Sequence, residues 1–492
     1  MTTTVETPAD TTSEELDALL DAATAAAPGL AASAPAERAG WIRAAADALD
    51  AAVDELVPLA QDETHLAEAR LRGEAGRSSG QLRLFADALA DGALLELVLD
   101  SADPDAKPLP RPDLRRTLVP LGPVLVFAAS NFPFAFSVSG GDTASALAAG
   151  CPVIVKTHPG HPRTSHATGR VLADALRSAG APEGTLGLIT GFDIGVEALR
   201  DPRVRAAGFT GSVPAGHALH EVAATRPEPI PFYGELGSLN PVVVTRGAVD
   251  ARGQQLVEGF VGSYTLGVGQ FCTKPGLLLL PADHGLDDAL AEASRAVDPA
   301  PLLHDGIGDG FAAGLERLRK LDGVESLVSA DASDATAVGA NLVRTTVPQL
   351  LADREALLAE CFGPVSVICE YADDAELRAA VDALEGNLTA TVHAEDDELD
   401  GLVDLVAALE RRAGRVLFGG WPTGVAVTWA MQHGGPYPST VGSIHTSVGV
   451  TAARRFQRPV CYQDVPQRLL PESLRDGNPL GLSRRVDGEV TR

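Results

Sequence analysis

The chain has 492 residues, of which 45% are hydrophobic and 21% are charged. This length predicts two or three domains that each bury a core, and the composition excludes both a disordered chain and a bundle of membrane helices. The formal net charge of −27 at pH 7 repels phosphate backbones and anionic lipids, so we expect neither nucleic acid nor a membrane as a partner.

The first hundred residues are expected to be mainly helical. Thr12 and Glu15 have the spacing of a capping box, and apolar residues recur at helical intervals over about 33–62 and 65–99. The segment 107–117 is rich in proline and arginine and too polar for a core. It therefore predicts an extended excursion or a hairpin.

Beyond residue 117, short apolar runs alternate with helical segments. The predicted strands are 123–129, 152–156, 185–190 and 206–210, followed by a second block at 241–245, 276–281, 364–371 and 415–420. The predicted helices between the first four strands lie around 142–149, 165–178 and 196–199. This alternation indicates parallel α/β sheets with helices on their faces. The last 40 residues lack periodicity and predict an arm that lies on a surface of this chain or of a neighbour.

Five cysteines are scattered along the chain without a CxxC pair: Cys151, Cys272, Cys361, Cys369 and Cys461. An odd, widely spaced set argues against a disulfide framework or a zinc ribbon. The first twenty residues also lack the basic start and apolar segment of a signal peptide. We therefore expect a reducing, cytoplasmic location.

Polar residues follow several of the predicted strands, where open α/β sheets bind their ligands. Taken singly, each has an ordinary structural explanation. Asn131 could bond to backbone, and Lys156 could reach solvent. Gly211 and Gly216 lack the GxGxxG fingerprint, and Cys272, beside glycine and aromatic residues, could be a small buried hydrophobe. Their joint occurrence in this order is harder to dismiss.

The full set of motifs resembles that of the NAD(P)-dependent aldehyde dehydrogenases over nearly the whole chain. The motifs are SNFP at 130–133, VIVK at 153–156, FTGS at 209–212, GELGSLNP at 234–241, GQFCTKPG at 269–276 and ECFGP at 360–364. A narrower resemblance, to the branch with 2-oxoglutarate semialdehyde (2,5-dioxovalerate) dehydrogenases and NADP-linked bacterial aldehyde dehydrogenases, rests on GGWPTGVAV at 419–427, MQHGGPYPST at 431–440, TSVG at 446–449 and RRFQRPVCYQ at 454–463.

The resemblance implies an α/β fold with three parts. A Rossmann-type cofactor domain is expected at 1–105 and 119–240, and an α/β catalytic domain at 241–445. An oligomerisation arm and C-terminal tail are expected at 106–118 and 446–492, so the resemblance predicts a homodimer or homotetramer.

The resemblance also implies a role for individual residues. Cys272 would attack the aldehyde to form a thioester, the Asn131 amide and the Cys272 backbone N–H would bind the oxyanion, and Glu235 would activate the hydrolytic water. The implied cofactor-binding residues are Lys156 at the adenosine ribose, Ser212 at a phosphate, Gly211 and Gly216 beside the pyrophosphate, Glu360 at the nicotinamide ribose and Phe362 at the nicotinamide. Cys151, Cys369 and Cys461 border or interrupt apolar runs and are expected to be structural, whereas Cys361 is expected near the site.

The cofactor and metal preferences follow from a few positions. NAD-preferring relatives commonly carry a glutamate three residues after the lysine, where this chain has Pro159, so NADP is expected to be preferred over NAD, with Lys156 and His158 supplying positive charge. No metal site is expected. The pairs His158 with His161 and His217 with His220 lack metal-site motifs and are interpreted as surface histidines.

The narrower resemblance favours 2-oxoglutarate semialdehyde as the substrate. The alternative is NADP-dependent oxidation of fatty or other simple aldehydes, because Ala426 stands where relatives often have an acidic residue, and Ile444 and His445 where they often have an arginine. A distal carboxylate would need a cation, and the sequence does not identify which arginine supplies it. Two alternatives from other functional classes also remain. The chain could be an acyl-CoA-forming enzyme that uses the same cysteine and cofactor, or a non-catalytic binding protein.

Overall fold

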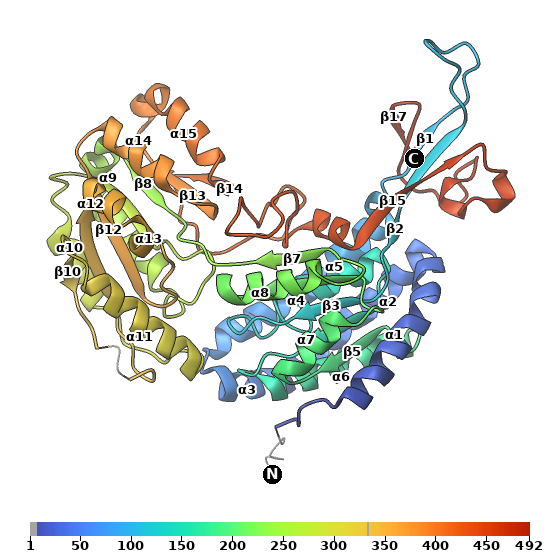
Figure 1. The fold of residues 1–492 in the computed structure, drawn as a ribbon, viewed down its shortest axis with the longest axis horizontal. Helices are drawn as coiled ribbons and strands as arrows, with labels where there is room; N and C mark the ends of the chain where they lie inside the picture. The colour runs from blue at the N-terminus through green and yellow to red at the C-terminus, as the bar shows by residue number, and fades with distance from the viewer. Residues whose placement is uncertain (1–6, 332–333) are drawn as a thin grey trace.

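The computed structural model describes residues 7–331 and 334–492. Figure 1 shows two α/β halves beside each other, with an arm projecting from the half that contains the N-terminal helices. The described strands form three sheets, two with five strands and one with seven. The expected α/β architecture is therefore confirmed.

The N-terminal region is helical, as predicted. Its helices are α1 Ser13–Ala32, α2 Pro35–Ala51, α3 Val53–Thr64 and α4 Glu68–Ala90. The capping box predicted from Thr12 and Glu15 is present at the start of α1. The single helical stretch expected at 33–62 is two helices that meet at Ala52, and the stretch expected to reach residue 99 ends at Ala90.

The first α/β sheet is parallel, with the strand order β5-β4-β3-β6-β7. Its strands are β3 Val124–Phe127, β4 Val153–Lys156, β5 Leu186–Ile189, β6 Ala206–Thr210 and β7 Phe232–Glu235, and its helices are α5 Gly141–Ala149, α6 Pro162–Ser178, α7 Phe192–Arg200 and α8 Val213–Ala224. In β3, Val124 and Val126 join the core shared with α2 and α4, whereas Leu125 and Phe127 join the core shared with α1 and α7. Both faces are covered, which explains the unbroken apolar run.

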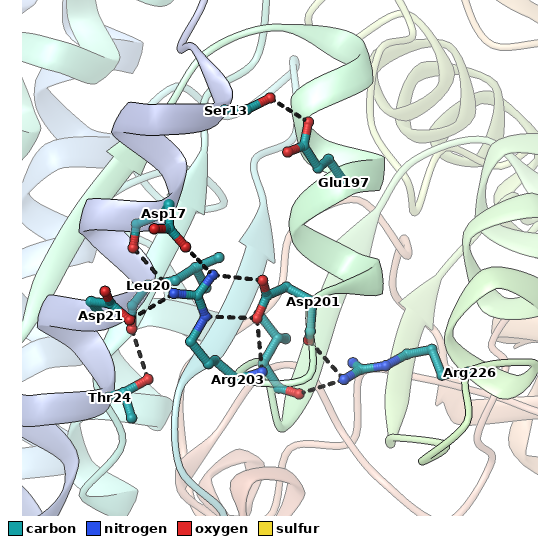
Figure 2. Close-up of polar contacts among 10 residues, drawn as sticks. Ser13, Asp17, Leu20, Asp21, Thr24, Glu197, Asp201, Arg203 and Arg226 are labelled. Atoms are coloured by element: carbon teal, nitrogen blue, oxygen red, sulfur yellow. Dashed lines mark hydrogen bonds and ion pairs between the residues drawn. The ribbon is translucent and has the colours of Figure 1, made fainter.

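Arg203 fastens α1 to this sheet (Figure 2). Its guanidinium lies 2.7 Å from carboxylate oxygens of Asp17, Asp21 and Asp201. The hydrogen bonds from Arg203 lower the pKa of Asp201. Arg226 binds the same turn by donating to the backbone carbonyl of Asp201 at 2.8 Å. The cluster joins a segment near the N-terminus to a loop almost 200 residues later.

The second α/β sheet has the order β10-β11-β12-β9-β8-β13-β14, with only the β10–β11 pair antiparallel among the described strands. Its strands are β8 Val242–Val244, β9 Leu277–Pro281, β10 Glu325–Val328, β11 Asn341–Thr346, β12 Val365–Tyr371, β13 Asn387–His393 and β14 Ala413–Phe418. This sheet packs against two apolar cores. One core contains residues of α9 Arg246–Tyr264 and α10 Asp287–Arg295. The second core contains residues of α11 Asp305–Arg319, α12 Val347–Ala352, α13 Arg354–Leu357, α14 Asp374–Ala383 and α15 Val403–Glu410.

The arm is a five-stranded sheet built from two distant parts of the chain. Its order is β15-β2-β1-β16-β17, with β1 Val98–Asp100, β2 Leu114–Pro120, β15 Gln457–Gln463, β16 Arg484–Val486 and β17 Glu489–Thr491. Asp103 and Arg111 exchange backbone hydrogen bonds, so the predicted excursion at 107–117 belongs to a hairpin. The C-terminal segment pairs with this hairpin, as Figure 1 shows.

Two expectations about burial need correction. Cys461 is exposed on β15, not buried in an apolar run, because its strand belongs to the outer edge of the arm sheet. His161 is fully buried, not a surface residue, and its ring contacts the Ala129 carbonyl at 2.9 Å and the Ser165 hydroxyl at 3.0 Å.

No described helix combines the length and the apolar character needed to cross a membrane.

Candidate active site

Cys272 lies in the loop that connects α9 to β9. The loop turns sharply through Gly267, Val268 and Gly269, which all have φ between 57° and 66°. A Cβ on Gly269 would overlap the carbonyl of Gly363, so a larger residue would push the two loops apart. The Cys272 carbonyl accepts a hydrogen bond of 2.8 Å from the Asn240 side chain. These contacts hold the backbone on either side of the sulfur.

Asn131 reaches the same loop from the end of β3. Its Nδ2 donates to the Gln270 carbonyl at 3.1 Å, two residues before Cys272, and its own carbonyl accepts from Arg70 Nη2 at 2.8 Å. The structure therefore brings together the two residues that the sequence assigned to the oxyanion. Asn131 follows β3 of the first sheet and the Cys272 loop precedes β9 of the second, so the bond from Asn131 to Gln270 links the two halves at this place.

Glu235 ends β7 and is 9% exposed. Its Oε2 is buried and has no hydrogen-bond partner among the described residues. Burial raises the pKa of Glu235 well above its usual value, and the nearby charge of Arg455 opposes this shift. The negative charge of Glu235 also raises the pKa of Cys272, so the Glu235 and Cys272 side chains lie within electrostatic range of each other. The raised pKa makes the ionised Glu235 carboxylate a stronger base than an exposed one, which suits it to take a proton from water.

His433 is a candidate functional residue that sequence reasoning missed. Its Nε2 lies 3.6 Å from Cys272 Sγ, and its backbone N–H donates to the Thr446 hydroxyl at 2.8 Å. The motif at 431–440 contains this histidine between Gln432 and two glycines. A histidine inside a glycine-rich loop is the signal that could have drawn attention to it.

Burial keeps the Cys272–His433 pair neutral in this structure. Burial raises the pKa of Cys272 to about 12, the carboxyl groups of Glu235 and Glu360 add to this rise, and Arg77 opposes it. Burial lowers the pKa of His433 to about 3, with further contributions from the charges of Arg415 and Arg77. A neutral imidazole can accept a proton from the neighbouring thiol when the sulfur forms its bond to carbon.

Three of the predicted cofactor-binding residues lie at the carboxyl-terminal edge of the first sheet. Lys156 ends β4, and Gly211 and Ser212 connect β6 to α8. Ser212 is exposed and caps α8 by accepting a hydrogen bond of 3.4 Å from Ala215. An ammonium group and the N-terminus of a twelve-residue helix on one edge fit the phosphates of a dinucleotide.

Gly216 lies in the first turn of α8, where its N–H donates to the Ser212 carbonyl at 2.9 Å, whereas Glu360 and Phe362 lie in a loop of the second half. Glu360 belongs to the loop before β12, its carboxylate lies beside Gly237, and burial raises its pKa to about 7. Phe362 is half-buried in the same loop. A Cβ on Gly216 would overlap the side chain of Leu236, so this glycine meets a packing requirement between α8 and the segment after β7. A carboxylate near the catalytic loop fits the hydroxyl groups of a ribose.

One group among the described residues has the composition of a metal site. His284 Nε2 lies 3.3 Å from Glu370 Oε1 and 3.6 Å from Asp287 Oδ1. However, His284 Nδ1 accepts a hydrogen bond of 3.0 Å from the Leu286 backbone N–H. In a neutral ring the proton must then be on Nε2, which lies near the two carboxylates without a hydrogen bond and offers no lone pair to a metal.

Two curated relatives are similar to this chain over most of its length. Alpha-ketoglutaric semialdehyde dehydrogenase 2 of Azospirillum brasilense is 47% identical over 460 residues, which cover 92% of this chain and 88% of the relative. Alpha-ketoglutaric semialdehyde dehydrogenase of Acinetobacter baylyi is 42% identical over 460 residues, covering 93% and 88%.

The fold is similar to that of two solved structures. Aldehyde dehydrogenase 21 of Physcomitrella patens has a TM-score of 0.76 at 19% identity, with 93% of this chain and 92% of that chain covered. Proline utilization A of Bradyrhizobium japonicum has a TM-score of 0.78 at 22% identity; this chain is 92% covered but spans only 45% of that longer chain. The model of the aldehyde dehydrogenase family matches residues 2–457 of this chain. The chain belongs to the aldehyde dehydrogenase family, whose enzymes oxidise aldehydes with NAD(P).

Proposed function

We propose that the chain oxidises 2-oxoglutarate semialdehyde to 2-oxoglutarate through a thioester on Cys272. The observation that carries the proposal is the placement of Cys272 Sγ 3.6 Å from His433, in a loop that also binds Asn131. Two relatives at 42% and 47% identity are alpha-ketoglutaric semialdehyde dehydrogenases, which supports this substrate. Alpha-ketoglutarate and 2-oxoglutarate are the same compound.

Addition to the aldehyde uses four groups from three residues of the chain. Cys272 Sγ bonds to the carbonyl carbon as its proton passes to His433 Nε2. Negative charge then develops on the carbonyl oxygen, which the Asn131 Nδ2 and the Cys272 backbone N–H stabilise. Each such donor contributes roughly 3–4 kcal/mol to the transition state in comparable enzymes.

Oxidation and hydrolysis follow. A nicotinamide cofactor would be held by the residues assigned to it above, namely Lys156, Gly211, Gly216, Ser212, Glu360 and Phe362. When bound, it would supply the acceptor for the hydride that leaves the carbon. Loss of the hydride leaves a thioester on Cys272. Glu235 takes a proton from water as its oxygen bonds to the thioester carbon. The carbon–sulfur bond then breaks, the sulfur regains a proton, and the carboxylic acid is released.

The preferred cofactor in this proposal is NADP. Pro159 supplies no carboxylate that would repel a 2′-phosphate, and Lys156 and His158 lie beside it in the loop after β4. Burial lowers the pKa of His158 well below its usual value, so the lasting positive charge at this place comes from Lys156. We expect a higher kcat/KM with NADP than with NAD. A hundredfold preference for NAD, about 2.7 kcal/mol, would contradict this choice.

The proposal includes assembly through the arm and a cytoplasmic location. Leu109, Leu469 and Val490 are exposed on or beside the arm sheet, so it offers apolar surface to another copy. All five cysteines are unpaired, which fits a reducing compartment. We expect a homodimer or homotetramer. Sedimentation as a monomer at micromolar concentration would contradict this assembly.

The decisive experiment compares aldehydes with and without coenzyme A. We expect 2-oxoglutarate semialdehyde to give the highest kcat/KM in a panel with succinate semialdehyde and medium-chain alkanals, without any need for coenzyme A. A higher kcat/KM for the alkanals would favour the fatty-aldehyde alternative, and dependence on coenzyme A would favour acyl transfer. Cys272→Ser should abolish turnover, whereas Glu235→Gln should keep a burst of about one reduced cofactor per site and lose about a hundredfold or more in kcat.

A further inference from the structure

Helix α4 presents three charged residues to the active-site loops. Arg70, Glu74 and Arg77 are spaced by four and three residues, which places them on one face of the helix. Arg70 donates to the Asn131 carbonyl, and Glu74 Oε1 accepts from the backbone N–H groups of Phe134 and Ala135 at 2.8 and 2.9 Å. These two residues therefore hold the loop that carries Asn131.

Arg77 has no comparable partner. Within the described residues it makes neither a hydrogen bond nor an ion pair, and its Nε is buried and unsatisfied. Its guanidinium carbon lies 5.5 Å from the ring centroid of Phe136 and 6.0 Å from that of Phe132. Glu74 is the nearby carboxyl group on the same helix, and burial raises its pKa to about 7. Arg77 is therefore a half-buried cation that makes no hydrogen bond within the described residues, and only its Nη groups are left to bind a ligand.

Arg77 lies within electrostatic range of the reacting sulfur. The ring of Phe136, on which Arg77 lies, is 6.3 Å from the ring of His433, and His433 Nε2 is 3.6 Å from Cys272 Sγ. The positive charge of Arg77 also acts on both Cys272 and His433. A single aromatic ring and the imidazole thus separate the guanidinium from the position where an aldehyde carbon would bond.

The other arginine that acts on Cys272 is already occupied. Arg415 donates to the carbonyls of Pro422 at 2.7 Å and Gly424 at 3.1 Å, and so fixes the segment after β14. Arg70 is bound to Asn131 in the same way. Arg70 Nε and Nη1 and Arg415 Nε are also buried without partners, but Arg77 is the member of this set that makes no hydrogen bond at all within the described residues. An unpaired, partly buried guanidinium is costly unless an anion arrives to bind it.

We propose that Arg77 binds the distal carboxylate of the aldehyde substrate and thereby selects carboxylated aldehydes over uncharged ones of the same length. This inference rests on the proposed function and adds the residue that determines specificity. The aldehyde and carboxylate carbons of 2-oxoglutarate semialdehyde are roughly 5 Å apart when the chain is extended. A guanidinium matches a carboxylate through two parallel hydrogen bonds. An uncharged aldehyde leaves these donors unpaired and is rejected for that reason.

The test compares Arg77→Gln with a control on the same helix. Arg72→Gln removes an exposed arginine that pairs with Asp54 and Glu68 on the outer face of α4. Each variant is assayed with 2-oxoglutarate semialdehyde and succinate semialdehyde, and with the uncharged pentanal and butanal. We expect Arg77→Gln to lower kcat/KM about a hundredfold for the two semialdehydes, mainly through KM, and less than threefold for the alkanals. Arg77→Lys should recover part of the loss, and Arg72→Gln should match the wild type.

A second measurement does not need turnover. By calorimetry, the wild type should bind 2-oxoglutarate more tightly than pentanoate, and Arg77→Gln should remove this difference. Equal losses for charged and uncharged aldehydes, or unchanged binding of 2-oxoglutarate, would overturn the role of Arg77. If the wild type oxidises no aldehyde at all, the proposed function fails, while the binding comparison still decides whether Arg77 recognises the carboxylate.

Discussion

Lys274 is expected to stabilise the loop that carries Glu360. The side chain is only 2% exposed, and its ammonium donates to the carbonyls of Cys361 at 2.7 Å, Gly363 at 3.2 Å and Val365 at 2.9 Å. Methionine keeps the length of the side chain but leaves these three buried carbonyls without their donor. Each hydrogen bond from a charged donor contributes about 1.5–3 kcal/mol, and removing the buried charge returns part of that through desolvation. We expect a net loss of about 3 kcal/mol.

Hydrogen exchange measures this loss where it occurs. A change of about 3 kcal/mol in local opening corresponds to about a hundredfold loss of protection for the amides of 361–367 in Lys274→Met. Lys320→Met is the matched control, because Lys320 is exposed and its one ion pair among the described residues is with Glu316, on the helix that Lys320 follows. That variant should change stability by less than about 0.5 kcal/mol. Unchanged protection at 361–367 in Lys274→Met would refute the reasoning.

Two further predictions concern ionisation. Burial raises the pKa of Cys272 to about 12, so little thiolate is present below pH 10. The rate of alkylation of Cys272 by iodoacetamide, measured on the Cys272 peptide, should therefore rise about tenfold per pH unit from pH 8 to 10. A rate that reaches a plateau below pH 9 would contradict this prediction. Arg203→Met should cost about 1–2 kcal/mol at pH 7 in guanidinium unfolding. Because Arg203 lowers the folded pKa of Asp201, this stabilisation is present above the unfolded pKa, about 3.9, and is lost as the pH falls through the folded pKa. An equal cost at pH 7 and at pH 2.5 would count against it.

The sequence predicted strands where burial on both faces leaves an unbroken apolar run, as in β3, β4 and β9. It missed β13, whose sequence NLTATVH is polar at several positions although every residue of the strand is buried. Asn387 in this strand accepts hydrogen bonds from the backbone N–H groups of Leu239 and Asn240, almost 150 residues earlier. A buried polar side chain is satisfied by a partner that only the tertiary structure supplies, so periodicity alone does not detect such a strand.

The candidate site likewise contains residues that the sequence predicted and residues that only the structure shows. Cys272, Asn131 and Glu235 lie in motifs that can be recognised locally, and their assigned roles came from a family resemblance. His433 contacts Cys272 across 161 positions of sequence, and nothing in the spacing of either motif predicts a distance of 3.6 Å. The sequence also left the arginine for a distal carboxylate open, because the chain has many arginines. The choice of Arg77 depends on which guanidinium groups the fold leaves without partners.

Helix α4 shows why such residues escape a motif search. Arg70, Glu74 and Arg77 follow helical spacing and would pass as charges on an exposed helix face, yet this face of α4 packs behind the loop that follows β3. Arg70 and Glu74 form hydrogen bonds with backbone groups of that loop, whereas Arg77 does not. A helix that only supported the loop would need no third charge there, since an unpaired half-buried guanidinium destabilises the fold. Its presence is explained if an anion completes the pair during catalysis, and the substrate's distal carboxylate is an anion of the right length and charge.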